Sequence, residues 1–480
     1  MITNRLLHVI LTPVLLLGLT GDLATAQRGG RGLGRGRGAP QVPVEDRGIR
    51  VNTDRALRGY TLFAPLTSDT TYLVDMEGQV VQTWTSDLAP SAWLYMRENG
   101  NVVRGGREPE TSGFGGGGQG GRFQEFTFDG ELVWDFSIND ETRLPHHDVA
   151  LLPNGNVLAV VWELQTPEEA RRAGRRENLI GDRGLWPDVL VELEPRPPDL
   201  ARVVWEWHAW DHLIQNLDPD LPNYGDPPEH PGRIDINGDD AAASANPPAN
   251  PPTDIFHTNS VAYNAELDQI ILSVPNFNEV WVIDHGTTTE EARGPAGDIL
   301  YRWGNPRTYG RGTPDDQRLG FEHDARWIPP GSPGAGNIMI FSNRTPGPDG
   351  THSRVYEIEP PVDDAGRYAL PEGEPFGPAE PVWTYADDAF DATYISGAER
   401  LPNGNTLISS GPQGRLLEVS PEGEIVWEYW SPYSGEFLSG NGAANPFSIF
   451  RAIRIPDDHP ALRGRALGPL DPQPAPASPQ

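Results

Sequence analysis

The sequence predicts an all-β fold, a six-bladed β-propeller, from two repeated patterns and their spacing. Six segments end in an aromatic strand, and in most of them two rings stand two positions apart, which places both on one face. Asn-Gly turns, typical of tight hairpins, recur at 99–100, 154–155 and 403–404. A hairpin followed by an aromatic strand, repeated about every 50 to 80 residues, is the pattern of four-stranded blades with loop insertions.

The aromatic strands set the blade boundaries. Their rings belong to Trp84, Trp134/Phe136, Trp205/Trp207, Tyr301/Trp303, Trp383/Tyr385 and Trp427/Tyr429. The predicted blades span 60–84, 92–136, 147–207, 257–303, 323–385 and 396–429. The first blade has only three apparent strands, and the apolar segment 448–455 has no other partner. We therefore expect this C-terminal strand to complete the first blade and close the ring, which removes the open edges of a repeat array.

The regions outside the predicted propeller, 52–456, differ from it in composition. Residues 1–26 have the pattern of a signal peptide, with Arg5, an apolar run and the cleavage pattern Ala24-Thr-Ala. Residues 27–51 are an Arg/Gly-rich segment predicted to be flexible, and 457–480 a loose Pro/Ala-rich tail. We expect an exported protein, periplasmic or extracellular. No transmembrane segment is predicted, since no second apolar run approaches the roughly 20 residues of a membrane helix.

The composition excludes several classes of function. The chain of 480 residues contains neither cysteine nor lysine, so thiol nucleophiles, thiolate metal sites and lysine Schiff bases are excluded. Its formal net charge is −31. This charge argues against nucleic acid as a partner, because phosphates bind to basic surfaces.

Three insertions interrupt the predicted blades. Residues 108–122 are rich in glycine and predict a mobile loop. The segment 166–172 begins with Thr-Pro-Glu-Glu, which predicts a short capped helix. The longest insertion, 211–254, is dense in Pro, Asn and Asp. A loop of this length within a compact fold is usually functional, and we interpret it as a lid or rim element.

Three histidines open the first strand of three successive blades: His147, His257 and His323. Both His147 and His323 stand six residues before a proline, which gives them the same register. Since inner strands run along the central channel of a propeller, their equivalent ends meet at its mouth. Of the neighbours His146 and His147, strand alternation lets only one face inward, and the match to His323 selects His147.

Converging imidazoles suit two chemistries. They could hold zinc with one open position for a water molecule. Alternatively, they could act as nucleophile, acid and base in the transfer of a group. An anionic group would also need a cation, and the candidates are Arg344, at the end of the second strand of the His323 blade, and Arg400 or Arg415 of the last blade.

Several long motifs resemble the bacterial arylsulfotransferase family, the aryl-sulfate sulfotransferases. The similarity extends from about residue 60 to 467. The motifs that carry it are Trp207-His-Ala-Trp-Asp-His-Leu-Ile-Gln-Asn, Pro222-Asn-Tyr-Gly-Asp, Ile234-Asp-Ile-Asn, His257-Thr-Asn-Ser-Val-Ala-Tyr-Asn, Asn276-Phe-Asn-Glu-Val-Trp-Val-Ile-Asp-His and Phe450-Arg-Ala-Ile-Arg.

The resemblance implies a fold, a reaction and roles for the histidines. Members of the family are exported six-bladed propellers that move a sulfuryl group from a phenolic ester to another phenol, without a nucleotide donor or other cofactor. By motif, His323 is similar to the nucleophile that becomes sulfated. His147 and His257 are similar to the partners that bind the sulfuryl oxygens and assist proton transfer. The implied partners are two small molecules, an aryl sulfate and a phenol.

One position departs from the family pattern. The family strand commonly reads Ser-Ser-Arg-Asn, whereas this chain reads Ser273-Val-Pro-Asn276, with Pro275 where the sulfate-binding arginine is expected. Arg344 and Asn276 remain as candidate substrate-binding residues. Two alternatives to sulfotransfer therefore stay open: an aryl sulfate hydrolase, or a propeller that binds a ligand or metal without transferring sulfate. The sequence does not indicate the donor, the acceptor or the oligomeric state.

Overall fold

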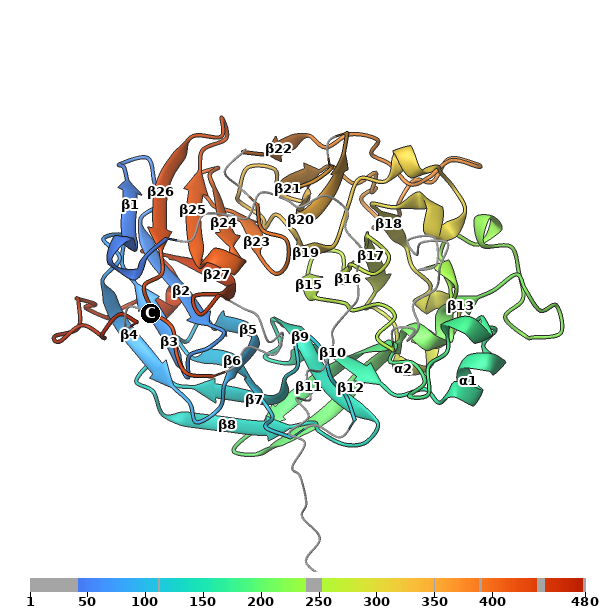
Figure 1. Cartoon of the computed structure of the whole chain (residues 1–480), viewed down its shortest axis with the longest axis horizontal. Coiled ribbons are helices and arrows are strands. Elements are labelled where there is room, and N and C mark those ends of the chain that lie inside the picture. Colours follow the sequence, from blue (N-terminus) through green and yellow to red (C-terminus); the bar gives the residue numbers. More distant parts are fainter. Residues whose placement is uncertain are drawn as a thin grey trace, which may run out of the picture. The chain divides into compact units, whose positions relative to one another are not determined.

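The repeated hairpins form six antiparallel sheets, which are arranged as the blades of a ring (Figure 1). The computed structural model describes residues 42–110, 113–238, 253–348, 350–387, 391–437 and 445–477. The predicted signal peptide and residues 27–41 of the Arg/Gly-rich segment lie outside these residues. In the described ranges, no helix is long and apolar enough to cross a membrane. The prediction of a six-bladed all-β propeller is confirmed.

Each of the first three blades contains four strands, ordered from the axis outward. Blade 1 consists of β27 (Ile449–Pro456), β2 (Gly59–Pro65), β3 (Thr70–Val74) and β4 (Val80–Thr85). Blade 2 consists of β5 (Pro90–Met96), β6 (Val102–Arg107), β7 (Gly121–Phe126) and β8 (Leu132–Ser137). Blade 3 consists of β9 (Arg143–Leu151), β10 (Val157–Glu163), β11 (Asp188–Arg196) and β12 (Leu200–His208).

The other three blades follow the same plan. Blade 4 consists of β15 (Ser260–Asn264), β16 (Gln269–Val274), β17 (Glu279–Asp284) and β18 (Tyr301–Trp303). Blade 5 consists of β19 (Glu322–Trp327), β20 (Ile338–Gly347), β21 (Gly350–Ile358) and β22 (Trp383–Tyr385). Blade 6 consists of β23 (Gly397–Arg400), β24 (Thr406–Ser410), β25 (Arg415–Val419) and β26 (Ile425–Trp430).

The C-terminal strand closes the ring as predicted. Strand β27 pairs antiparallel with β2, with Tyr60 opposite Ile455 and Leu62 opposite Ile453. It is the innermost strand of blade 1 and contacts the inner strands β5 and β23 of both neighbouring blades. The last regular strand of the chain thus lies against the central axis.

Two segments predicted to be loose are ordered against the propeller. Strand β1 (Gly48–Asn52), placed by the sequence mainly in the flexible segment, pairs with the outer strand β26 as a fifth strand of its sheet. It covers a sheet edge that would otherwise be unpaired. In the predicted tail, Leu462 is buried against blade 1, and the Leu470 N–H donates to the Val80 carbonyl over 2.8 Å. Burial of a few apolar side chains anchors this segment despite its proline content.

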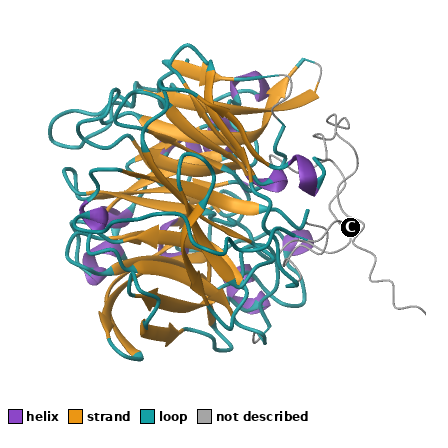
Figure 2. Ribbon diagram, turned by 90° about the vertical axis from the view of Figure 1, so that its left-hand side faces the viewer, coloured by secondary structure: helices purple, strands orange, loops and turns teal. Residues whose placement is uncertain are grey.

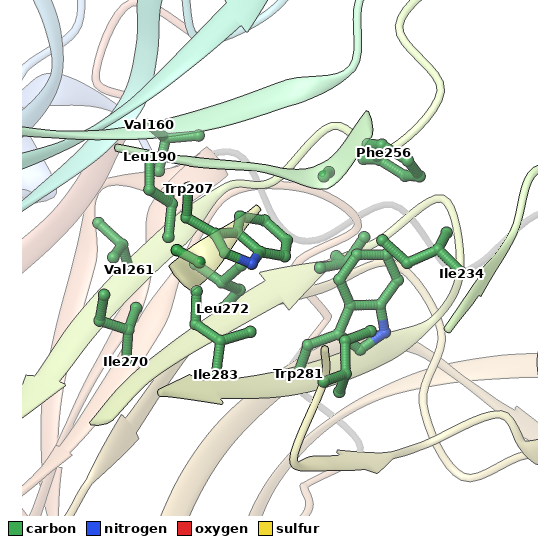
Figure 3. Packing of buried hydrophobic residues seen from close by; sticks show 14 of the residues in the cluster. Val160, Leu190, Trp207, Ile234, Phe256, Val261, Ile270, Leu272, Trp281 and Ile283 are labelled. Atoms are coloured by element: carbon green, nitrogen blue, oxygen red, sulfur yellow. The ribbon is translucent and has the colours of Figure 1, made fainter. Parts of the chain in front are cut away.

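The core lies between neighbouring blades. Figure 3 shows the largest cluster, in which Trp207 of blade 3 packs near Leu272 and Ile283 of blade 4, with Trp281 beside them. Both tryptophans are 1% exposed. In the side view the strands run through the body of the molecule, with loops and a few short helices between and around them (Figure 2).

The helices are short and lie in segments that connect or flank the strands. The predicted capped helix is α1 (Pro167–Arg172), in which Thr166 and Glu169 form a reciprocal capping box. A second such helix is α2 (Thr289–Ala292). The 3₁₀ turns are η1 (Val44–Asp46), η2 (Glu177–Leu179), η3 (Ala209–His212), η4 (Pro227–Glu229), η6 (Pro295–Gly297), η7 (Pro306–Tyr309), η8 (Pro314–Asp316), η9 (Gly411–Gln413) and η10 (Pro460–Leu462).

The described part of the long insertion packs onto the propeller. It forms a small parallel sheet of β13 (Leu213–Ile214) and β14 (Ile234–Asp235), whose apolar residues join the core cluster of blades 3 and 4. None of its described residues lines the cavity at the centre of the ring, and Asp254 at its end bonds to His257. The interpretation of the insertion as a lid or rim element stays a prediction. Residues 239–252 of the insertion lie outside the described ranges.

Polar side chains join successive blades near the axis. At four junctions a carboxylate or hydroxyl of one blade accepts the N–H of the inner strand of the next blade, over 2.9–3.1 Å. The pairs are Asp148 with Val261, Ser260 with Ala325, Asp324 with Ala398, and Ser409 with Ala452. These bonds fix the positions of the inner strands along the axis. Strands β9 and β19 contain His147 and His323, and β15 begins three residues after His257.

Candidate active site

His147, His257 and His323 come from three neighbouring blades and meet at one cavity of about 350 Å³. His147 lies in β9, His257 just before β15, and His323 at the start of β19. The ring centroids of His147 and His257 are 4.4 Å apart. The structure thus brings together the three histidines that the repeated register selected.

Hydrogen bonds fix the tautomer of His323. Its Nδ1 lies 2.7 Å from the Oδ1 of Asn343, on β20. The amide nitrogen of Asn343 donates to the carbonyls of Ala392 and Ile395, so its oxygen must face the imidazole. Nδ1 of His323 is therefore the protonated nitrogen, and Nε2 carries the lone pair.

His257 is held by a carboxylate. Its Nδ1 bonds to Oδ2 of Asp254 over 2.5 Å, and its backbone N–H donates to the other oxygen of the same carboxylate. Asn276 donates to the Asp254 carbonyl and steadies this turn from behind. Asn276 is not among the residues that line the cavity, so its place indicates support for Asp254 rather than contact with a substrate.

His147 is oriented by a relay of buried groups. His146, which is fully buried, bonds through Nε2 to Asp188 over 3.1 Å and faces His147 Nδ1 with its own Nδ1 over 2.8 Å. Because Asp188 accepts the Nε2–H of His146, Nδ1 of His146 is an acceptor and Nδ1 of His147 donates to it. His147 therefore also keeps its lone pair on Nε2. Of the adjacent pair, His147 lines the cavity, as the sequence predicted.

The three imidazoles differ in their affinity for protons. Burial lowers the pKa of His323 to about 3, although the bond to Asn343 opposes this shift. Burial also holds the pKa of His147 well below its ordinary value, and the neighbouring His257 adds to the effect. Burial would lower the pKa of His257 as well, but the Asp254 carboxylate outweighs it and raises this pKa. The site thus combines two imidazoles that burial keeps neutral with one, His257, whose protonated form is stabilised by the Asp254 carboxylate.

The left-handed backbone at two of these histidines shows that the surrounding fold holds them. His147 has φ of 54° and His257 φ of 58°. Such angles are costly for residues with a side chain and persist only where the neighbouring structure imposes them.

In the part of the chain that the structure describes, no three His, Asp or Glu side chains are arranged to hold a metal ion.

The cavity walls combine aromatic surface with arginine. Arg344, predicted as a cation for this site, lines the cavity, stacks over Phe321 at 4.3 Å and donates through Nε to the Thr393 carbonyl. No aspartate or glutamate is among the described lining residues. The apolar part of the wall comes from Leu66, Pro90, Ala92, Phe321, Tyr394, Ile395 and Phe450.

The glycine-rich insertion lies against His147. Gly117, Gly118 and Gln119 line the cavity, and the Gly118 carbonyl accepts the His147 N–H over 2.7 Å. A Cβ on Gly118 would come within 2.3 Å of three atoms of the His147 ring. The described part of this loop, predicted to be mobile, therefore packs on a histidine of the site, and glycine is what permits the close approach.

The other predicted arginines lie elsewhere. Arg400 is ion-paired with Glu357, and Arg415 with Glu428 over 2.7 Å; neither lines the cavity. Pro275, where the family has arginine, is buried after β16 and does not line the cavity either.

Arg107 and Phe450 are among the residues of the cavity wall that sequence reasoning missed. Arg107 ends the second strand of blade 2, the place near which Arg344 stands in blade 5, so the same rule could have found it. Phe450 faces the cavity because β27 is an inner strand, and its ring lies 6.0 Å from that of His323.

Comparison with solved structures gives distant matches only. A protein of unknown function from Bacteroides caccae is 10% identical, covers 82% of this chain and 98% of its own, and has a TM-score of 0.42. A streptogramin B lyase is 10% identical over 82% of this chain and 85% of its own, with a TM-score of 0.37. The periplasmic gluconolactonase of Pseudomonas aeruginosa is 12% identical over 83% and 99%, with a TM-score of 0.38. At TM-scores this low the matches carry no argument about this chain.

Comparison with families is decisive. No curated protein matches the chain significantly. The sequence profile of the family described as Arylsulfotransferase (ASST) matches residues 61–429, which include all three histidines of the cavity. The chain therefore belongs to the arylsulfotransferase family.

Proposed function

We propose that this protein is an exported aryl sulfotransferase that uses no nucleotide donor and transfers the sulfuryl group through a sulfated His323. Membership of the family supports sulfotransfer in general. The observation that carries the finer proposal is the bond between His323 Nδ1 and Asn343, which leaves Nε2 as a lone-pair donor at a cavity without lining carboxylates among the described residues.

In the first half-reaction, His323 Nε2 attacks the sulfur of the aryl sulfate. The N–S bond forms as the bond between sulfur and the phenolic oxygen breaks. His257, protonated and tied to Asp254 through Nδ1, gives its Nε2 proton to the leaving oxygen. The products of this step are a free phenol, a neutral His257 and a sulfated His323 whose Nδ1–H still bonds to Asn343.

In the second half-reaction, a different phenol enters the same cavity. Its oxygen attacks the sulfur while Nε2 of His147 takes up its proton. His147 then passes this proton to Nε2 of the neighbouring His257, which the first step left neutral. The N–S bond breaks and the electron pair returns to His323. The proton ends on His257, which restores the starting protonation of all three imidazoles.

The arginines of the cavity are the proposed cations for the sulfuryl oxygens. Arg344 lies over Phe321, whose ring is 5.6 Å from His323 and 6.2 Å from His257. A guanidinium can bind two oxygens of a tetrahedral anion at once. Arg344 and Arg107 of blade 2 thereby supply the positive charge that the family's arginine supplies at the position of Pro275.

The test measures release of nitrophenol from p-nitrophenyl sulfate by the purified mature protein, with and without added phenol. We expect release to depend on phenol and to be lost in His323→Ala. Mass spectrometry after incubation with the donor alone should show one added sulfuryl group on His323. His208→Ala, in the outer strand of blade 3, is the matched control and should retain transfer.

Other results would support the alternatives. Release that requires no phenol indicates an aryl sulfate hydrolase. Stoichiometric zinc in protein purified without a nickel column contradicts the nucleophile assignment. A folded protein that releases nothing under any of these conditions indicates a propeller that only binds its ligand.

Export is a separate proposal that rests on residues 1–26. We expect cleavage after Ala26, so that the mature protein begins at Gln27. N-terminal mass spectrometry of protein from fractionated cells tests it, and an intact Met1 in the cytoplasmic fraction would contradict it.

A further inference from the structure

We propose that Arg451 is a positioning residue of this site, a buried guanidinium that ties together the aspartates following His147 and His323. The inference rests on the proposed function for its catalytic consequence. Its geometric part concerns the two imidazoles directly and can be tested without any substrate.

Arg451 lies where three blades meet. It belongs to β27, the inner strand of blade 1, and its side chain is 3% exposed. One terminal nitrogen lies 2.8 Å from Asp148 of blade 3, and the other lies 2.9 Å from Asp324 of blade 5. A single guanidinium thus joins three alternate blades across the axis.

Each aspartate is itself fixed on other sides. Asp148 accepts the Tyr95 hydroxyl through Oδ1 over 2.9 Å and the Val261 N–H through Oδ2 over 3.1 Å. Asp324 accepts the Ala398 N–H over 2.9 Å. A carboxylate held at both oxygens leaves its own backbone little freedom.

The backbone at these positions carries the histidines. Asp148 directly follows His147, which has φ of 54°, and Asp324 directly follows His323 and has φ of 57° itself. Because these angles need support from outside the strand, the ion pairs with Arg451 help to hold both turns. The guanidinium therefore sets the separation of the imidazole that attacks and the imidazole that receives a proton.

The charge of Arg451 acts on the same imidazoles. Burial is the main reason why the pKa values of His147 and His323 are low, and the positive charges of His257 and Arg451 both add to it. Other groups surround the two imidazoles: His146 and His257 lie beside His147, and Asn343 lies beside His323. The two aspartates are surrounded by Tyr95, Arg326 and Glu399. Removal of Arg451 takes away one cation and leaves Asp148 without its ion pair, while Asp324 keeps its ion pair with Arg326. Both imidazoles should therefore bind protons more readily.

A plain stabilising role is the competing explanation, and the chain offers a matched control. Arg454 lies three residues further along β27 and is equally buried, with an ion pair to Glu418 over 3.2 Å. Its guanidinium also contacts the Leu57 carbonyl and the Met76 sulfur, and it stacks over the Trp427 ring. Loss of Arg454 should therefore destabilise the propeller without altering the histidines.

The experiment compares Arg451→Met, Arg451→Lys and Arg454→Met. The titration of His147 and His323 is followed by ¹⁵N NMR of histidine-labelled protein, assigned with His147→Gln and His323→Gln. We expect Arg451→Met to raise both titration midpoints by about one pH unit or more and to lower kcat/KM about 100-fold. Arg451→Lys, which keeps the charge, should recover most of the midpoint shift and part of the activity.

Two results would overturn the proposal. One is a titration of both imidazoles in Arg451→Met that matches the wild type; the other is the same shift in Arg454→Met. If Arg451→Met does not fold, the Asp148→Asn variant tests the same proposal. Its amide oxygen can still accept the Val261 N–H, while the ion pair with Arg451 is lost. It should move the His147 midpoint downward, and an unchanged midpoint would refute the inference. A wild-type protein without sulfotransferase activity would refute the proposed function only, because the NMR measurement needs no substrate.

Discussion

Replacement of Gly118 by alanine tests whether the glycine-rich loop holds His147 in place. A Cβ at this position would lie 2.3 Å from the imidazole, whereas ordinary contacts begin at 3.4 Å. The ring or the loop must therefore move by about 1 Å, and a displacement of this size at a reacting group costs about 100-fold in rate. We expect kcat/KM for an aryl sulfate donor to fall by this factor.

A second glycine of the same loop separates this effect from backbone strain. Gly118 has φ of 76° and Gly113 has φ of 88°, so alanine is unfavourable at either position by about 1–2 kcal/mol. No atom lies within 4 Å of a Cβ built on Gly113. Both variants should lose similar stability in urea unfolding, but only Gly118→Ala should lose activity. Wild-type kcat/KM in folded Gly118→Ala would refute the reasoning.

Three further predictions concern the proton donor, the cation and the core. Asp254→Asn removes the charge that raises the pKa of His257, so the fall of activity on the alkaline side should move to lower pH and transfer at pH 7 should drop about 100-fold. An alkaline limb that stays in place would contradict the role of His257 as acid. Arg344→Gln should lower kcat/KM about 10- to 100-fold, because a hydrogen bond to a charged group contributes about 1.5–3 kcal/mol. Arg415→Gln, outside the cavity, should leave the chemistry unchanged, and equal losses in both variants would count against Arg344. Trp207→Ala, in the packed cluster between blades 3 and 4, should cost about 3–5 kcal/mol in urea unfolding; a cost below about 1 kcal/mol would mean that this cluster contributes little.

The blades could be predicted because their signals are local and repeated. The aromatic residues of an outer strand share one face, and three tight hairpins have an Asn-Gly turn within a few residues of sequence. The closing strand β27 was found by elimination, since an apolar strand needs a partner. Strand β1 was missed because its partner is β26, far away in sequence, and its own residues carry no marked alternation.

The histidines could be predicted for the same reason, whereas their partners could not. Equivalent register places His147, His257 and His323 at one end of the channel. Asn343 and Asp188 act through side-chain geometry that no spacing rule encodes. Arg451 was part of a motif that indicated the family, yet its bonds to two other blades follow only from the closed ring.

The closed ring also bears on the arginine that the family pattern expects at Pro275. In a propeller, the ends of corresponding strands in different blades face one central cavity, so a side chain on one blade can serve a ligand held by another. Arg344 on blade 5 and Arg107 on blade 2 both line this cavity, although neither is near Pro275 in sequence. The arginine of the site can therefore be encoded on a different blade, and the cavity still contains a positive charge. The departure at Pro275 accordingly weighs less against sulfotransfer than it does in the linear motif, and the variants of Arg344 measure how much less.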